Sequence, residues 1–286
     1  MNAISGGPRD DRDRCDGAAM SAPDDPVQIA WQPLTMRGVA AFARASLGRL
    51  LVVQLIVAML AAGTVVWFLQ TCWFPIISEA IRALPLQGEI RSGSLDWIGS
   101  SPTRLAEGRF LSFVVDLDHA GDARSPAHVQ VEFGQADFKV YSLLGFVRGT
   151  YPPNRTVAFN RTELGPWWGA WAPMILALAT GFVVVGLMVI WACLATVYCL
   201  PVWLISLFVS RDCSLGGSWR LAGAALMPGA LLICVAMVLY GWGVLDLVRL
   251  AVVGAVHLVM GWVYLLICPR CLPRHSTVAV SSNPFQ

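Results

Sequence analysis

The sequence predicts an α-helical integral membrane protein with four transmembrane helices and an inserted extracytoplasmic β-rich domain. Of its 286 residues, 56% are hydrophobic and only 13% are charged, and the mean hydropathy of +0.62 is far above that of a soluble domain. Residues 75–166, in contrast, are polar and lie between two apolar runs. The net charge of +2 favours no nucleic-acid partner, so the expected partner is the lipid bilayer, and no cofactor is predicted.

The N-terminal residues precede the first apolar run and are of two kinds. Residues 1–35 are rich in Pro, Gly and Asp and predict a disordered cytoplasmic tail, within which Met20, and just after it Met36, are alternative starts. Residues 36–49 place three arginines among small apolar residues, which is typical of a juxtamembrane amphipathic segment.

The apolar runs predict where the chain crosses the bilayer, since a span needs about 20 apolar residues. The first run has a long N-terminal extension and favours an uncleaved signal anchor. Pro201 is expected to interrupt the second run, and Pro228 lies early in the third. The predicted spans are 50–73, 170–198, 221–241 and 247–268, with a cytoplasmic interfacial segment at 199–220 and a cytoplasmic tail at 269–286.

Residues 75–166 predict five or six strands. The clearest pattern is the alternation of Val129, Val131 and Phe133 with polar residues, followed by the turn sequence GQAD and a second strand. This predicts a β-hairpin with one buried face. The domain is expected to bind a protein partner, an envelope component or a small ligand.

The arginines of the short loops predict the orientation, because such loops are enriched in basic residues on the cytoplasmic side. With four spans, Arg249 alone lies near the outer side, and both termini are cytoplasmic. Splitting residues 170–209 into two spans gives a five-span alternative. The excess of arginine over lysine suggests a GC-rich bacterial genome, and the expected location is the bacterial inner membrane. The arginines predicted to share the cytoplasmic side are Arg37, Arg44, Arg49, Arg211, Arg220, Arg270 and Arg274.

One span, a β-rich insert and three further spans form a layout that resembles a bacterial membrane family of unknown function, distantly similar to the Yip membrane proteins. The most specific part is SLGGSWRLAGAALMPGALL, which includes Ser218, Trp219, Arg220, Gly223 and Pro228. The resemblance covers about residues 40–268 and implies this architecture. It also implies either an accessory role in sugar uptake or a role in membrane shaping or trafficking.

His257 lies near the middle of the fourth predicted span, where ionisable residues are costly and usually face the bundle. Gly254, Gly261, Tyr264 and Cys268 share its helix face, and the glycines predict close packing on another helix. Two interpretations remain open. His257 is either a proton or ligand site, or a neutral imidazole bonded to a backbone carbonyl or to one of three polar side chains, Thr180, Thr64 or Gln54.

Cys268 and Cys271 form a C-x-x-C spacing, with His275 after them and Cys213 on the same predicted membrane face. A zinc site of these four residues, acylation of the cysteines and a plain helix terminus are the three interpretations.

Three further features have simple expected roles. Asp246 and Arg249 predict a helix cap with an ion pair. The loop DLDHAGD lacks the ligand pattern of a calcium-binding helix-loop-helix and predicts a solvated turn. Asn154 and Asn160 are glycosylation acceptors only in a eukaryotic secretory pathway.

No catalytic motif is present, so a non-enzymatic membrane protein is expected, as an accessory of a transport or envelope system. The alternative is a small transporter or channel subunit that uses the face around His257.

Overall fold

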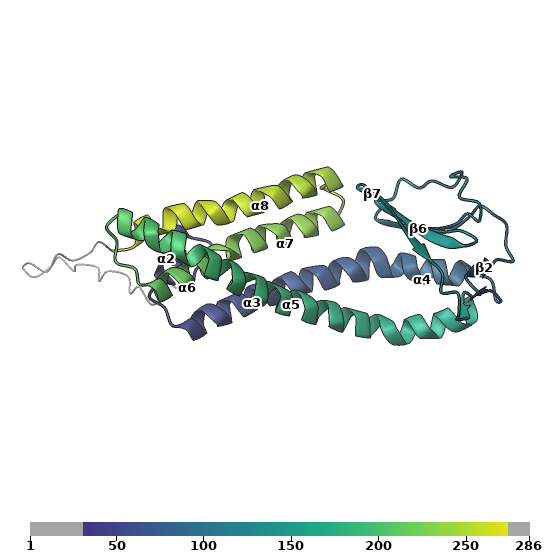
Figure 1. Cartoon of the computed structure of the whole chain (residues 1–286), viewed down its shortest axis with the longest axis horizontal. Coiled ribbons are helices and arrows are strands. Elements are labelled where there is room, and N and C mark those ends of the chain that lie inside the picture. The colour runs from purple at the N-terminus through teal and green to yellow at the C-terminus, as the bar shows by residue number, and fades with distance from the viewer. Residues whose placement is uncertain (1–30, 274–286) are drawn as a thin grey trace, which may run out of the picture.

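The computed structural model describes residues 31–273. It is mostly helical, and four of its helices are long and apolar enough to cross a membrane. A separate β-sheet region lies at one end of the helices (Figure 1). The first thirty residues and those after Pro273, among them Arg274 and His275, lie outside the described part of the chain.

The helices and strands follow one another in the order expected from the sequence. The helical elements are α2 (Met36–Ala41), α3 (Leu47–Phe68), the π-helix η1 (Leu69–Trp73), α4 (Phe74–Ala83), α5 (Arg161–Phe208), α6 (Leu215–Ala225), α7 (Met227–Gly241), α8 (Leu247–Ile267) and the 3-10 helix η2 (Cys268–Cys271). The strands are β1 (Glu89–Arg91), β2 (Ser94–Asp96), β3 (Thr103–Glu107), β4 (Leu111–Val115), β5 (Val129–Phe133), β6 (Asp137–Ser142), β7 (Gly145–Thr150) and β8 (Val157–Ala158).

The first candidate span is longer than the predicted 50–73. Helix α3, the π-helix and α4 form one continuous run of 37 residues, Leu47–Ala83, which is about 55 Å at 1.5 Å per residue. Pro75 lies in the first turn of α4, where proline is tolerated. Helix α4 packs Ile76 and Ala80 into the core of the sheet region, so residues after 75 belong to that core although they continue the helix of the span.

Helix α5 is one unbroken helix of 48 residues, about 72 Å long, so it extends beyond the predicted 170–198 span at both ends and contradicts the five-span alternative. Asn160 caps its start, because the Asn160 side chain accepts a hydrogen bond from the Glu163 backbone nitrogen at 2.9 Å. Pro201 lies inside the helix and does not end it. The segment 199–209 is therefore helical and continuous with the span.

The other two candidate spans are shorter. Helices α6 and α7 form the third, Leu215–Gly241, with a break at Leu226 just before Pro228. Helix α8 has 21 residues, about 32 Å, which matches the roughly 30 Å hydrocarbon core of a bilayer. Asp246 caps α8 by accepting from the Arg249 nitrogen at 2.7 Å and pairs with the Arg249 side chain, as predicted.

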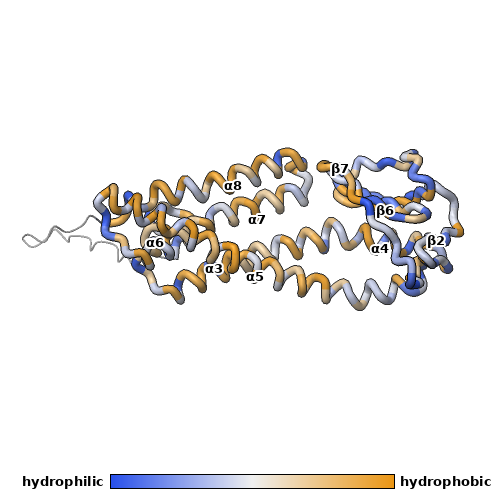
Figure 2. Tube along the Cα trace, viewed as in Figure 1, coloured by the Kyte–Doolittle hydropathy of each residue, from blue (hydrophilic) through white to orange (hydrophobic). Residues whose placement is uncertain are grey.

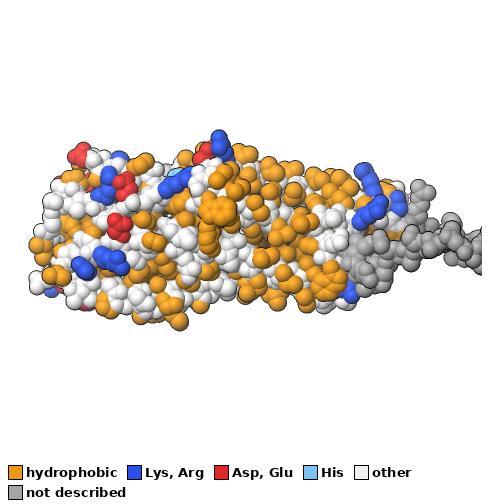
Figure 3. Space-filling model, turned by 180° about the vertical axis from the view of Figure 1, so that it is seen from behind, with side chains coloured by type: hydrophobic (Ala, Val, Ile, Leu, Met, Phe, Trp, Pro, Cys, Tyr) orange, Lys and Arg blue, Asp and Glu red, His pale blue; other side chains and the backbone are white. Residues whose placement is uncertain are grey.

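The unequal lengths of the spans place the β-sheet region beyond the end of the α7–α8 hairpin. Figure 1 shows the α3–α4 run and α5 extending past that hairpin as a long pair. Apolar residues follow the helices, and polar residues collect in the sheet region (Figure 2). The face seen in Figure 3 is largely apolar over the bundle, with charged side chains toward its ends.

The sheet region contains a five-stranded sheet, β3-β4-β5-β6-β7, and a three-stranded sheet, β2-β1-β8. The predicted hairpin is confirmed as the antiparallel pair β5–β6, with Phe133 opposite Phe138. Strands β4 and β5 are parallel, so the chain between them has to cross back over the sheet.

Both faces of the five-stranded sheet are covered at strand β5. Phe113, Phe133 and Phe138 pack in one core with Ala80 and Leu84 of the α4 segment. The polar face of β5 is buried too: Glu132 is 1% exposed and Gln130 is 3% exposed. The prediction of a hairpin with a single buried face was therefore incomplete.

The far end of the bundle holds several of the arginines that the sequence assigned to one side, among them Arg44, Arg211 and Arg220. Arg44 pairs with Asp212 at 3.3 Å, and Arg220 donates a hydrogen bond to the Ala43 carbonyl oxygen at 2.9 Å. Val39 and Phe42 are fully buried there, so the 36–49 segment packs into the bundle and does not lie free on its surface.

Candidate functional site

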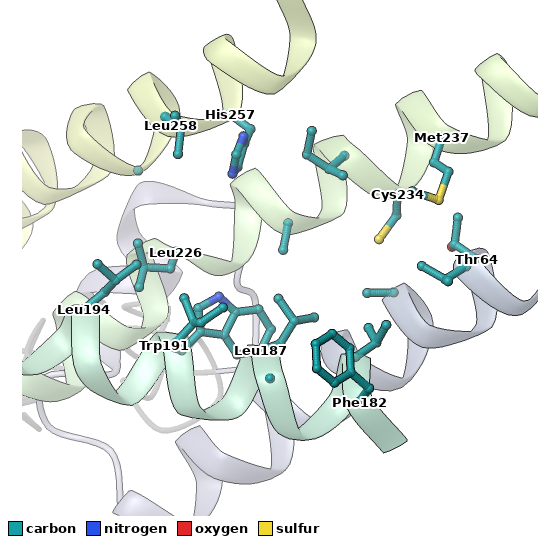
Figure 4. A pocket seen from close by; sticks show the side chains of 18 of the residues that line it. Thr64, Phe182, Leu187, Trp191, Leu194, Leu226, Cys234, Met237, His257 and Leu258 are labelled. Carbon is teal, nitrogen blue, oxygen red and sulfur yellow. The ribbon is translucent and has the colours of Figure 1, made fainter. Parts of the chain in front are cut away.

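A cavity of about 580 Å³ lies between the four candidate spans. This volume is within the roughly 300–1,000 Å³ range of small-molecule sites. No Asp, Glu, Lys or Arg is among the described residues that line it. Figure 4 shows side chains from α3, α5, α7 and α8 around it, including Phe182, Leu187, Trp191, Leu226, Met237 and Leu258.

The break between α6 and α7 shapes one wall of this cavity. Pro228 has no backbone N–H and lies in the first turn of α7, so α6 ends at Ala225 and α7 starts at Met227. Leu226 stands between the two helices and lines the cavity. Pro228 thus acts on the cavity through the backbone, although its own side chain is not in the lining.

His257 lies at the α8 side of the cavity, and its ring extends toward α7 (Figure 4). Its Nδ1 lies 2.5 Å from the Gly254 carbonyl oxygen, which can only accept, so Nδ1 carries the proton. In the neutral ring Nε2 is then an acceptor, and no described residue hydrogen-bonds to it. The backbone alternative predicted for His257 is the contact observed.

The predicted helix face around His257 divides into two parts. Gly261, Tyr264 and Cys268 are buried against the bundle. A Cβ atom at Gly254, by contrast, would meet nothing within 4 Å, so this glycine is not needed for close packing. The close approach is made from α7, where a Cβ at Gly229 would lie 2.9 Å from the His257 carbonyl oxygen.

The cysteines at the far end of the bundle have separate contacts. Cys268 is fully buried, with its sulfur 3.8 Å from the Met36 sulfur, whereas Cys271 is exposed. The Cys213 sulfur lies 3.2 Å from the Ser218 hydroxyl oxygen. No group of three or more His, Cys, Asp or Glu residues within 31–273 is placed to hold a metal ion, and His275 lies outside that range.

A second polar centre lies in the sheet region, beneath the segment that connects β4 and β5. The His119 ring lies between two buried carboxylates, with Nδ1 2.6 Å from Glu132 and Nε2 2.5 Å from Asp137. Arg148 also pairs with Asp137, and the Gln130 amide donates to Glu132 at 3.2 Å. Ionised carboxylates only accept, so both bonds to the ring require a proton on each ring nitrogen or on a carboxyl group.

The structure therefore gives the DLDHAGD loop a role that the sequence did not predict. His119 adopts a positive φ of 55°, a conformation that histidine tolerates better than most residues, and this turn points its ring into the sheet. Asp116 is 2% exposed and accepts a hydrogen bond from the Gly121 nitrogen at 2.9 Å. The loop is a lid over the polar face of the sheet, and the predicted solvated turn was wrong at these residues.

Asp137 makes the stability of the sheet region depend on pH. Burial alone would raise the pKa of Asp137, but hydrogen bonds and charge from His119 and Arg148 outweigh it and hold this pKa below its usual value. A lowered pKa stabilises the fold above the unfolded pKa of about 3.9, and that stabilisation is lost as the pH falls through the folded pKa.

We therefore expect the sheet region of the full chain to lose stability as the pH falls below about 3.9. Amide hydrogen exchange of β5 and β6 in detergent micelles measures this. Asp137→Asn cannot ionise, so it should be less stable at neutral pH and show a smaller loss on acidification. An equal acid-induced loss in both proteins would contradict the role of Asp137.

Comparisons with known proteins found no match: no protein-family model, no curated protein and no solved structure matches this chain. The resemblance to the Yip membrane proteins therefore stays a prediction. The candidate sites have to be interpreted from their own geometry.

Proposed function

We propose that this protein is a non-enzymatic multi-pass membrane protein that binds an apolar, lipid-class ligand between its spans. The observation that carries the proposal is the cavity of about 580 Å³ with its apolar wall. We further propose that it serves as an accessory of a transport or envelope system, in which the sheet region offers a surface to a partner protein.

The lining favours an apolar ligand over an ion. Removing a charge from water costs many kcal/mol unless a partner compensates it, and no charged side chain of the described residues faces this cavity. The alternative predicted from His257 is a small transporter or channel subunit. To carry an ion, it would need a charged side chain to compensate the ion or a hydrated path between the spans. The cavity supports binding of a membrane-dissolved molecule more directly.

His257 adds one hydrogen bond to this apolar site. Because Nδ1 donates to Gly254, Nε2 of the neutral ring can accept a hydrogen bond from a ligand. The preferred ligand thus has a long apolar body and a hydroxyl donor, such as a long-chain alcohol. An alkane of the same length would leave Nε2 without a partner.

We also propose the orientation: a bacterial inner membrane, with cytoplasmic termini and the sheet region outside. The support is that Arg44, Arg211 and Arg220 are gathered at the end opposite the sheet region, as the positive-inside rule requires of a cytoplasmic end. An impermeant maleimide should then label the exposed Cys271 from the cytoplasmic side only. Labelling of Cys271 from outside would reverse the orientation.

Protection of Cys234 tests the binding proposal, because this thiol lines the cavity. In a full chain with Cys234 as its only cysteine, hexadecanol should slow alkylation by a small apolar maleimide at least about tenfold, or ~1.4 kcal/mol. Hexadecane should protect less, and His257→Phe should remove that difference.

The matched control retains Cys193 instead, which lies exposed on α5 outside the cavity lining. Hexadecanol should leave its alkylation rate unchanged. Equal protection of both thiols, or protection of neither, would contradict a ligand site in the cavity.

A further inference from the structure

A second cleft, of about 450 Å³, lies between the sheet region and the start of α8. The wall on the sheet side holds Arg124, Ser125, His128 and Tyr141, and the opposite wall holds Asp246, Leu247 and Val248. The tip of the β6–β7 hairpin closes one side with Leu143. This cleft has charged and polar side chains in its lining, unlike the cavity between the spans.

The cleft lies where α8 begins, which is one end of a helix about as long as a bilayer is thick. Val248 lines it, and Val252 and Val256 follow at steps of four on the same face of α8, all three exposed. An apolar row therefore leads from the cleft down the surface of the candidate span. A headgroup in the cleft would have its acyl chains on that row.

The hairpin tip extends this apolar surface. Leu143, Leu144, Phe146 and Val147 are all exposed, and Leu144 is 97% exposed. Figure 1 shows the β7 end of the sheet beside the loop that joins α7 and α8, and Figure 2 shows apolar residues there. Large apolar side chains at this level are covered when they enter the interface of a bilayer.

The cleft offers one arginine to an anion. The Arg124 guanidinium lies 4.0 Å from the centre of the Tyr141 ring, and no carboxylate of the described residues pairs with it. Arg109 donates a hydrogen bond to the Leu245 carbonyl oxygen at 3.1 Å beside the cleft. Asp246, the one carboxylate in the lining, is already paired with Arg249.

We propose that this cleft binds the phosphate of a glycerophospholipid from the surrounding bilayer, with Arg124 as its main ligand and the valines of α8 beneath the acyl chains. Guanidinium groups bind phosphate with directed hydrogen bonds, and the Tyr141 ring beneath Arg124 holds the guanidinium in place. This site is separate from the cavity between the spans and does not depend on what that cavity binds.

Native mass spectrometry of the full chain in detergent tests the proposal, with phosphatidylglycerol as the probe. The wild type and Arg124→Lys should each retain one bound phosphatidylglycerol. Arg124→Gln should weaken the binding of this lipid at least about tenfold. Arg91→Gln is the matched control, because Arg91 pairs with Glu89 in the other sheet. Its binding should equal that of the wild type.

Two further probes and one variant identify the source of the phosphate and the site. Diacylglycerol lacks the phosphate and glycerol phosphate lacks the chains, so each should bind far more weakly than phosphatidylglycerol. Gly186→Phe, which fills the cavity between the spans, should leave phosphatidylglycerol bound. Wild-type binding by Arg124→Gln, equally tight binding of either probe, or loss of the lipid in Gly186→Phe would overturn the proposal.

Discussion

Replacing His119 with alanine should destabilise the sheet region by roughly 3–5 kcal/mol, the largest effect expected of a single substitution here. The variant leaves Glu132 and Asp137, which are 1% and 3% exposed, without their shared partner. Two buried carboxylates then either stay charged at a high cost or take up protons. Hydrogen exchange of β5 and β6 amides in the full chain measures the loss.

Two variants of nearby residues control this experiment. Asp118→Asn changes an exposed residue of the same loop and should stay within about 0.5 kcal/mol of the wild type. Gly134→Ala places a Cβ against the His119 ring and should destabilise in the same direction as His119→Ala. A loss below about 1 kcal/mol in His119→Ala would mean that the three side chains do not form a buried charge network.

Replacing Gly186 with phenylalanine should abolish ligand binding between the spans. Gly186 lines the cavity, and a Cβ there would meet nothing within 4 Å, so the new ring can enter the open volume without striking a neighbouring helix. Protection of Cys234 by hexadecanol should fall at least about tenfold. The variant should still fold, because no existing contact is removed.

The control for Gly186→Phe is Gly181→Phe, five residues earlier on α5. Gly181 is exposed, has equally open surroundings and does not line the cavity. It adds the same apolar ring to the same helix, and hexadecanol should still protect Cys234. If hexadecanol protects Cys234 in both variants as well as in the wild type, the ligand does not occupy this volume.

The candidate spans were predictable because apolar runs and helix caps are local signals. Asp246 caps α8 as its position suggests, and the α8 boundaries agree with the predicted span to within a residue. The lengths of the α3–α4 run and of α5 were not predictable in this way. The bilayer thickness sets a minimum length for a span, but contacts outside it, such as Ile76 and Ala80 against the sheet, decide how far a helix continues.

The polar centre in the sheet region shows a different limit of sequence patterns. Alternation in β5 correctly separates Gln130 and Glu132 from the apolar side chains. The polar side chains of such a strand are usually expected to face solvent. Here the parallel pairing of β4 and β5 brings a crossing loop over that face, and His119 enters from 13 residues away. Such a contact depends on strand order, which alternation does not specify.

The cavity between the spans likewise depends on the packing of helices distant in sequence. His257 could be identified as an intramembrane polar residue, but Thr64, Gly186 and Cys234 carry no signal that links them to it. Gly229 was missed because it matters only through the close approach of α7 to the backbone of α8, which depends on how the helices pack. Pro228, which was identified, acts only by separating α6 from α7.

Photo-crosslinking of a diazirine-bearing fatty alcohol to the full chain in lipid vesicles tests the central claim most directly. If the cavity binds the alcohol, peptide mapping should find adducts at Leu187, Cys234 and Met237, and Gly186→Phe should remove them. Adducts confined to lipid-facing positions such as Val252, and unchanged by Gly186→Phe, would contradict a ligand site between the spans.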